Sequence, residues 1–415
     1  MFASDQLLNF SPERENTLSA NAVNLEQPNA NLEQPPELTV VMPCLNEART
    51  LGDCIRLIQS TVDAHNIDAE ILVADNGSTD GSIEIAESLG ARVVHIPTKG
   101  YGNALRGGIE AARGKFVIMG DSDMSYDFGD IPKFVERLRN GADLAMGNRF
   151  LGGIKPNAMP VLHKYLGNPG LTAIGRLFFR ATVNDFYCGL RGFRKTSYQA
   201  MGLRTTGMEF ALEMVVKASL LGMKVTELPT TLSPDGRDRR PHLKTWRDGW
   251  RSLRFFLLYS PRWLFYYPGL LLMIVGLAVC AWLIPGPKRL HIATLDVHTL
   301  LYAAGAVVLG FQSVVFAVFT KFFAITEGLL PEDPRLNRAF RYITLETGAL
   351  TGLLIFLCGL AMSVWAFHRW SVGHFGPLDY SSMLRRVIPA VLALILGGQI
   401  IFSSFFMSVL GLKRR

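Results

Sequence analysis

The sequence predicts an α/β domain with a mostly parallel, Rossmann-like sheet, followed by an interfacial helix and a membrane domain of four helices. From residue 38 to about residue 229, short apolar runs alternate with helical patterns, which is typical of parallel strands joined by right-handed crossovers. After residue 262, four apolar stretches are each about long enough to cross a bilayer. The composition excludes a wholly disordered chain, since 49% of the 415 residues are hydrophobic. The net charge is +7.

Residues 1–36 are expected to form a disordered tail. They are polar, and Asn24–Pro28 recurs as Asn31–Pro35, a pattern that cannot bury a core. No apolar run follows a basic start, so we expect no signal peptide. The five cysteines are scattered without a C-x-x-C spacing, which favours reduced thiols over disulfides or a zinc site.

The α/β domain is expected over residues 37–236. A helix is predicted where Leu51, Ile55, Ile58 and Val62 repeat at helical spacing. Apolar runs predict strands at Leu38–Met42, Ile71–Ala74, Val93–Ile96, Phe116–Met119, Leu144–Met146 and Val225–Pro229.

A later helix is expected from about Gly207. Thr206 and Glu209 fit a capping box at its start, although a role of Glu209 in a ligand site stays open.

Polar motifs follow several of these strands at their carboxyl ends, where open α/β sheets bind ligands. The run Phe116–Met119 leads into Asp121-Ser122-Asp123. Two carboxylates at i and i+2 can hold a hard divalent cation that shares its shell with substrate phosphates. A solvated acidic turn is the alternative for this motif alone, but the other strand ends also carry polar residues, which favours a site.

Other residues suit a phosphate-bearing ligand. Asp75 is placed to accept hydrogen bonds from a base or ribose, and Arg149 is suited to a fork-like grip on phosphate. Lys99-Gly100-Tyr101-Gly102 offers flexible backbone near phosphates, with a plain turn as the alternative. Neither a Walker A pattern nor a G-x-G-x-x-G fingerprint stands at the first strand.

Five motifs follow one another along the chain: VVMPCLNEARTL, VADNGSTDGS, KGYGNALRGGIEAARG, GDSDMSYDFGDIP and GNRFLGG. Taken together, they resemble the family-2 inverting glycosyltransferases of the GT-A fold, and in particular dolichyl-phosphate mannose synthases and bacterial polyprenyl-phosphate glycosyltransferases. The resemblance covers about residues 38–245. It implies a nucleotide-sugar donor, Mg²⁺ or Mn²⁺ as cofactor, and a lipid phosphate acceptor.

The resemblance also implies roles for single residues. Asp121, Asp123 and, more weakly, Ser125 would bind the metal. The catalytic set would be Asp121, Asp123, Arg149 and Asp185. The donor would contact Pro43, Leu45, Glu47, Asp75, Asn76, Lys99, Asp121, Ser122, Asp123, Arg149, Arg237, Arg240 and Lys244.

The sequence departs from the family pattern at three places. Asp75 is followed by Asn76 rather than by a second Asp, and Ser125 stands where mannose synthases often have Gln. The usual late loop Arg-x-x-Gly-x-Ser-Lys is replaced by residues 236–244, which keep its cations. The individual roles of Arg237, Arg240 and Lys244 are therefore open.

Residues 237–262 form a basic amphipathic segment before a transmembrane domain at 263–415. A stripe with Trp246 and Trp250 faces away from Lys244 and Arg251, which suits a helix in the membrane interface better than a nucleic-acid patch. The predicted spans are Leu264–Ile284, Leu300–Ala324, Ala349–Phe367 and Val387–Leu410. Lys321 is placed to snorkel near one end of the second span. Basic residues outside the spans favour a cytosolic N-terminal domain and cytosolic termini.

The function expected from this is a membrane enzyme that moves one sugar, from a UDP-glucose or GDP-mannose type donor, to undecaprenyl or dolichyl phosphate with inversion. It would work at the cytosolic face of a bacterial or cyanobacterial type inner membrane, without nucleic acid and as a possible homo-oligomer. A hydroxyl acceptor, such as a glycolipid or a growing polysaccharide, and a non-catalytic nucleotide-sugar-binding scaffold are the alternatives. A processive synthase would carry Gln-x-x-Arg-Trp, which residues 366–370 lack.

Overall fold

The computed structural model describes residues 35–236, 245–291, 293–334, 336, 338, 344–377 and 379–411. The predicted tail, apart from its last two residues, and the late-loop candidates Arg237, Arg240 and Lys244 lie outside the described residues.

Seven strands form one sheet in the order β3-β2-β1-β4-β6-β5-β7. Neighbouring strands are parallel except for β6, which pairs antiparallel with both β4 and β5. The predicted mostly parallel sheet is confirmed, but the sequence pattern missed β6 because two of its four residues are arginines. The strands are β1 Leu38–Cys44, β2 Ala69–Asp75, β3 Arg92–His95, β4 Phe116–Met119, β5 Leu144–Asn148, β6 Arg191–Arg194 and β7 Val225–Pro229.

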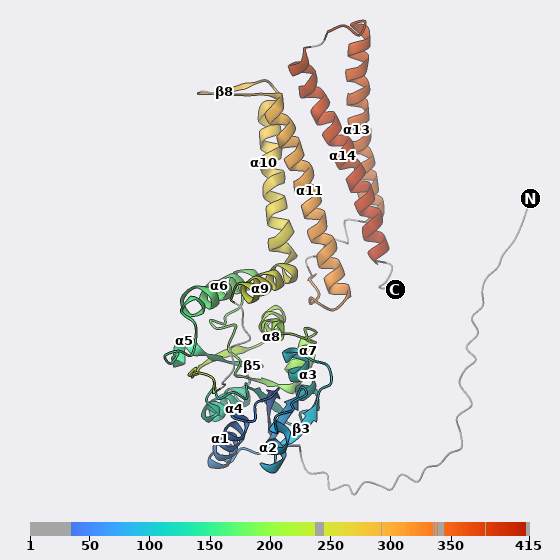
Figure 1. The fold of residues 1–415 in the computed structure, drawn as a ribbon. Helices are drawn as coiled ribbons and strands as arrows, with labels where there is room; N and C mark the ends of the chain where they lie inside the picture. The colour runs from blue at the N-terminus through green and yellow to red at the C-terminus, as the bar shows by residue number, and fades with distance from the viewer. Residues whose placement is uncertain are drawn as a thin grey trace, which may run out of the picture. The chain divides into compact units, whose positions relative to one another are not determined.

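Helices cover both faces of the sheet, because alternate residues of a strand point to opposite faces. Val40 and Met42 of β1 belong to one hydrophobic cluster, whereas Val41 belongs to the other. The first cluster packs against α1 Leu51–Ala64, α2 Ser82–Ser88 and α4 Ile131–Arg139. The second packs against α3 Tyr101–Ala111, α6 Asn168–Phe179, α7 Lys195–Met201, α8 Glu209–Leu220 and α9 Thr245–Tyr259 (Figure 1).

Short helical turns lie between these elements. They are η1 Phe128–Asp130, α5 Arg149–Gly152, η2 His163–Gly167 and η3 Arg262–Tyr266. One of them, α5 after β5, begins with Arg149 of the candidate site described below.

Four helices are long and apolar enough to cross a membrane, so the four predicted spans are confirmed: Arg262–Leu283, Val297–Thr326, Leu345–Val372 and Tyr380–Gly411. The first joins η3 to α10 Tyr267–Leu283, and the others are α11, α13 and α14. Between α10 and α11 stands the hairpin of β8 Lys288–Leu290 and β9 Ala293–Leu295. Lys321, which was expected to snorkel, forms an ion pair with Asp333, so its charge has a partner within the protein.

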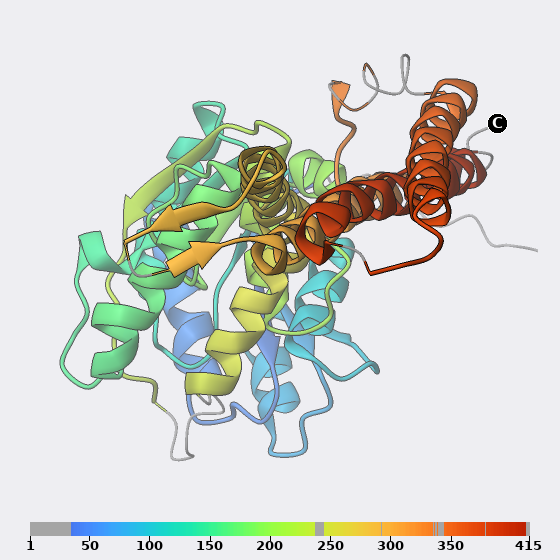
Figure 2. The ribbon, with the colours of Figure 1, turned by 90° about the horizontal axis from the view of Figure 1, so that it is seen from above.

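Helices α13 and α14 lie side by side (Figure 1 and Figure 2). A Cβ on Gly397 would meet the backbone nitrogen of Phe356 at 2.6 Å, and one on Gly359 would meet the carbonyl of Ala390 at 2.8 Å. Small residues at such crossings let membrane helices approach closely.

Candidate active site

The crevice between β1 and β4 is where the strand order reverses, since β2 and β3 lie on one side of β1 and β4 on the other. Two hydrogen bonds fix the loop after β4 here. The Ser122 hydroxyl donates to the Pro43 carbonyl at 2.9 Å, and the Thr50 hydroxyl donates to the Ser122 carbonyl at 2.7 Å. Ligands of α/β sheets bind at such a switch point. The structure therefore brings the Asp-Ser-Asp loop and the Pro43 motif together.

Both carboxylates of this loop are oriented by neighbours. The phenol of Tyr101 donates to Asp121 Oδ1 at 3.0 Å, and the backbone N–H of Ser125 donates to Asp123 Oδ1 at 3.0 Å. Burial, and next the charge of Asp121, raise the pKa of Tyr101 well above its usual value, so the phenol stays a donor. Gly189 stands against Asp121, since a Cβ there would lie 2.8 Å from Asp121 Oδ2.

The donor set fits a cation that arrives with phosphates. Of the residues that the structure describes, none belongs to a cluster of three or more His, Cys, Asp or Glu side chains suited to a metal. Two carboxylates are nevertheless what Mg²⁺ usually takes from a protein, because waters and substrate phosphates complete its octahedral shell. Ser125 supports Asp123 through its backbone N–H, whatever its hydroxyl contributes.

Asp75 ends β2 and orders the turn that follows it. Its oxygens accept hydrogen bonds from the backbone N–H groups of Gly77 and Ser78, and His95 lies 3.3 Å away. Burial raises its pKa, but the hydrogen bonds from Ser78 and Gly77 outweigh burial and leave the pKa of Asp75 below its usual value. Asp75 is therefore a carboxylate at neutral pH.

Asn76 holds the loop that carries Lys99. Its amide nitrogen donates to the carbonyls of Ile96 and Thr98, both at 2.9 Å, while its side-chain oxygen accepts from the N–H of Gly100 at 2.8 Å. Lys99 Nζ donates to the Asn76 carbonyl. The Asn at the second position of the acidic motif thus fixes the start of α3, and with it Tyr101.

The loop after β1 is joined to the loop after β2. The N–H of Asn46 donates to the Ser78 hydroxyl at 3.0 Å, and that of Glu47 donates to the Ser82 hydroxyl at 2.9 Å. Glu47 is buried, whereas Leu45 is 40% exposed at the mouth of the crevice. An apolar side chain beside these loops is suited to the face of a base.

Arg149 and Asp185 form one buried unit. Arg149 Nε and Nη2 each donate to a different oxygen of Asp185 at 2.7 Å, and the N–H of Arg149 also donates to it at 3.1 Å. Asp185 is fully buried. Burial lowers the pKa of Arg149, but the groups around it, including Tyr126 and Asp185, more than compensate and raise it. The resemblance put Asp185 in the catalytic set, and in the structure it is the partner of an arginine.

Two residues that sequence reasoning missed position this region. Glu227 of β7 accepts from the N–H groups of Asn184 and Asp185, and also from the Asn148 amide at 3.0 Å. The Tyr126 hydroxyl accepts from the N–H of Gly189 at 2.7 Å. Tyr126 lies in the GDSDMSYDFGDIP motif, which is the one signal that could have identified it.

The predicted capping box at α8 is wrong. The helix begins at Glu209 with Met208 as its N-cap and has no side-chain capping bond. Glu209 instead pairs with Arg251 of α9. The Tyr259 hydroxyl of α9 donates to Glu213 of α8 at 2.9 Å, so two contacts fasten the predicted interfacial helix to the α/β domain.

An apolar patch on η2 and α6 was not predicted. Its side chains are between 58% and 74% exposed: Val161 just before η2, Tyr165 and Leu166 of η2, and Leu177 of α6. Next to it, Phe178 stacks on Trp263, which opens the first membrane span, at 5.1 Å between ring centroids. Exposed apolar area that is continuous with a membrane span indicates contact with lipid.

Two family models match the chain. Residues 39–202 match glycosyl transferase family 2, and residues 318–411 match the glycosyltransferase family 2 C-terminal transmembrane region. These two segments are the α/β domain through α7 and the last part of α11 through α14.

Relatives agree with the family models. The low-salt glycan biosynthesis hexosyltransferase Agl6 of Haloferax volcanii is 36% identical over 383 residues, 91% of this chain and 89% of that protein. A dolichyl-phosphate hexose transferase of the same organism is 29% identical over 46% of this chain and 81% of that protein. Among solved structures, glucosyl-3-phosphoglycerate synthase from Mycobacterium tuberculosis with Mn²⁺ and UDP gives a TM-score of 0.43 at 22% identity, covering 54% of this chain and 78% of that one.

Proposed function

The chain belongs to glycosyltransferase family 2 and is an integral membrane enzyme, and we propose that it transfers a single sugar from a nucleotide sugar to a polyprenyl phosphate. A phosphate oxygen of the lipid attacks C1 of the sugar. The bond from C1 to the nucleoside diphosphate breaks, and its electron pair leaves with the diphosphate. Attack opposite to the leaving group inverts the anomeric centre.

The donor is proposed to bind across the β1 and β4 switch point. Leu45, Glu47 and Asp75 lie on the loops that border the nucleoside side, and Asp121 and Asp123 lie on the diphosphate side. A bound Mg²⁺ or Mn²⁺ would neutralise the diphosphate as it leaves. Tyr101 keeps Asp121 oriented, and the Ser125 N–H does the same for Asp123. A UDP-glucose or GDP-mannose type donor meets these requirements.

The contact between Arg149 and Asp185 is the single observation that carries the choice of acceptor. A hydroxyl nucleophile needs a positioned general base, which contributes about 10²–10⁴-fold. Both oxygens of Asp185, the candidate base, are bound by Arg149. A phosphate needs no base, because its second pKa is about 6 and it is anionic at neutral pH. This supports a phosphate acceptor over a hydroxyl.

Lipid access supports the same proposal. The patch on η2 and α6, together with Trp246 and Trp250 on α9, presents apolar and aromatic side chains next to the first span. One relative is named a dolichyl-phosphate hexose transferase. We place the catalytic domain at the cytosolic face of a bacterial-type inner membrane, because basic residues flank the spans on that side and nucleotide sugars are cytosolic.

One assay tests the proposal directly. Purified full-length protein is incubated with UDP- and GDP-sugars and with either polyprenyl phosphate or uncharged polyprenol, and lipid products are identified by mass. A product from the phosphate alone, with a β linkage from an α-linked donor, is expected. Transfer to polyprenol or diacylglycerol at a comparable rate would contradict the proposed acceptor and favour the hydroxyl alternative.

A further inference from the structure

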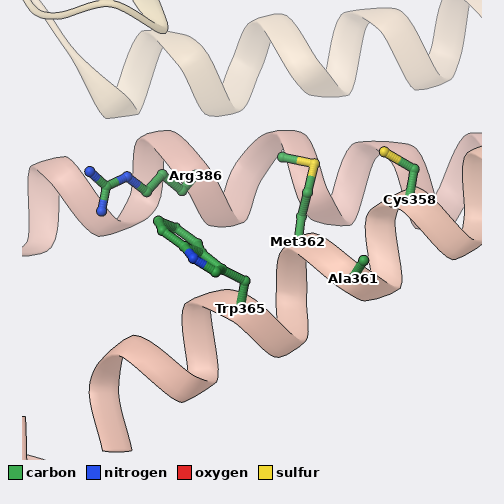
Figure 3. Close-up of a pocket in the computed structure, with 5 residues that line it drawn as sticks. All are labelled: Cys358, Ala361, Met362, Trp365 and Arg386. Atoms are coloured by element: carbon green, nitrogen blue, oxygen red, sulfur yellow. The ribbon is translucent and has the colours of Figure 1, made fainter. Parts of the chain in front are cut away.

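Helices α13 and α14 form an open groove of about 430 Å³ in the transmembrane domain. It is lined by Cys358, Ala361, Met362 and Trp365 of α13 and by Arg386 of α14. The four α13 residues follow the spacing i, i+3, i+4 and i+7, so they share one helix face. Figure 3 shows the Arg386 side chain close to the Trp365 ring at one end of this groove.

Two arginines gather at that end. The guanidinium of Arg386 lies 5.2 Å from the centre of the Trp365 ring, and that of Arg369 lies 5.8 Å from it. Among the residues that the structure describes, no acidic side chain forms an ion pair with Arg369 or Arg386. An arginine stays charged at any physiological pH. Two positive charges therefore stand beside an apolar groove, and no carboxylate in the described part of the chain is ion-paired with them.

The neighbouring Arg385, unlike Arg369 and Arg386, has a carboxylate partner within the described ranges. It forms an ion pair with Asp296 at the start of α11, and Ser381 donates to the same carboxylate at 3.1 Å. That pair places the start of α14 beside the start of α11, next to the β8–β9 hairpin and at the end of the bundle away from η3. The acid at this end that lies nearest in sequence to Arg386 is Asp379, seven residues away and exposed.

We propose that this groove binds an anionic phospholipid of the bilayer, with its phosphate beside Arg369 and Arg386 and an acyl chain along Met362, Ala361 and Cys358. Guanidinium groups match phosphate oxygens through paired N–H donors. The groove supplies the other half of the recognition, because a hydrocarbon chain fills an apolar surface in a span. A phospholipid carries both parts and needs no reaction at the distant catalytic domain.

A basic residue beside anionic lipid headgroups is worth about 1 kcal/mol, or about fivefold in affinity. If the two arginines act alike on a bound anionic lipid, its preference over a neutral one is about thirtyfold. A zwitterionic phospholipid with the same acyl chains fills the groove equally well, but the two arginines attract it less because its net charge is zero.

The test uses delipidated full-length protein in detergent and native mass spectrometry. Dioleoyl-phosphatidylglycerol and dioleoyl-phosphatidylcholine are titrated into wild type, Arg369→Gln/Arg386→Gln and the control Arg289→Gln. Arg289 is an exposed arginine of β8 at the same end of the bundle. A second variant, Met362→Trp, fills the groove and leaves both arginines in place, so the proposal stays testable if the double variant folds poorly.

Wild type and Arg289→Gln are expected to bind phosphatidylglycerol about thirtyfold more tightly than phosphatidylcholine. The double variant should lose that preference, and Met362→Trp should weaken both lipids. Unchanged phosphatidylglycerol binding in both variants would overturn the proposal. So would a wild-type site that ignores phosphatidylglycerol and binds only glycosylated polyprenyl phosphate, because the occupant would then be the reaction product.

Discussion

Two buried arginines near the crevice are satisfied in different ways. Arg149 binds a carboxylate, whereas Arg191 donates to the carbonyls of Phe186 and Cys188 at 3.0 and 2.9 Å and also to Ala211. Burial lowers the pKa of Arg191, and nearby groups only partly offset it. Two of these carbonyls belong to the segment between Asp185 and Gly189, and the third, that of Ala211, ties this segment to α8. The two arginines thus fix the wall of the site opposite to the Asp-Ser-Asp loop.

Replacing the two loop carboxylates tests the metal assignment. Asp123→Asn is expected to abolish turnover, and Asp121→Asn to do nearly as much, because each removes a charge the cation needs and keeps the shape. Steady-state turnover with a chelator should match both, with recovery after added Mn²⁺ or Mg²⁺. The matched control is Asp127→Asn, an exposed carboxylate that accepts only from Gly129 N–H among its described bonds. Full wild-type activity in chelator would rule out the assignment.

Asp185→Asn separates structure from catalysis. Since Arg149 would lose a buried partner, we expect a loss of stability of about 3–5 kcal/mol, measured as a lower thermal midpoint. The turnover of the folded fraction should fall by less than about tenfold, because a phosphate acceptor needs no base. A loss of about 10³-fold in kcat at unchanged stability would instead identify Asp185 as a general base.

At the scale of elements, α8 and α9 hold the α/β domain to the first span. Glu213 of α8 is fully buried and accepts from Thr205, from the N–H of Arg204 and from Tyr259 of α9. It also pairs with the buried Lys217 at 3.2 Å. The loop before α8 touches α3 too, since the N–H of Asn103 donates to the Thr206 carbonyl at 3.2 Å. Through α3 it is connected to Tyr101 and the site.

Low pH is expected to remove the stability that Glu213 contributes through its contacts with the loop before α8 and with α9. Burial raises the pKa of Glu213, but the hydrogen bonds from Thr205 and Arg204 and the charge of Lys217 outweigh it, so the folded pKa lies below 4.5. Its contribution to stability is therefore complete above about pH 4.5 and is lost as the pH falls through the lowered folded value. Glu213→Gln should lower the thermal midpoint most at neutral pH, and the difference from wild type should shrink below pH 4.5. The control Glu87→Gln changes an exposed acid on α2. An equal difference at every pH would contradict this role of Glu213.

The patch on η2 and α6 should touch lipid. In a Cys358→Ser background, a fluorophore on Leu166→Cys is expected to be quenched by lipid-borne nitroxides in liposomes. The same fluorophore on Glu87→Cys of α2 should not be, because Glu87 is exposed on the other helical layer. Equal quenching at both positions would mean that the patch does not enter the interface.

At the scale of the whole molecule, the orientation of the spans decides which compartment supplies the donor. Cysteine labelling in sealed vesicles should find Asp238→Cys accessible only from the cytosol and His291→Cys, in the β8–β9 hairpin, only from outside. Basic residues retained in the cytosol give the physical reason. Arg385, a basic residue at the end of the bundle that is expected outside, is paired with Asp296. The reverse labelling pattern would exclude cytosolic nucleotide sugars as donors.

The sequence by itself determined the α/β class, the strand ends with polar motifs and the four spans, because these depend on local hydrophobic periodicity and length. It did not determine β6, since the buried Arg191 and the exposed-looking Arg-Gly-Phe-Arg run give no apolar signal. Nor could spacing show that Glu209 pairs with Arg251, 42 residues away, rather than capping its own helix.

Only the tertiary structure decided which partner each polar residue of the site contacts. Asp185 and Arg149 stand 36 residues apart, and their pairing follows from the meeting of the β5 end with the segment before β6. Asn76 holds the Lys99 loop, Tyr101 orients Asp121, and Glu227 fixes Asn184 and Asp185. Each of these contacts joins distant parts of the chain at one edge of the sheet. A local pattern specifies which residues are polar, whereas packing determines which partner each one meets.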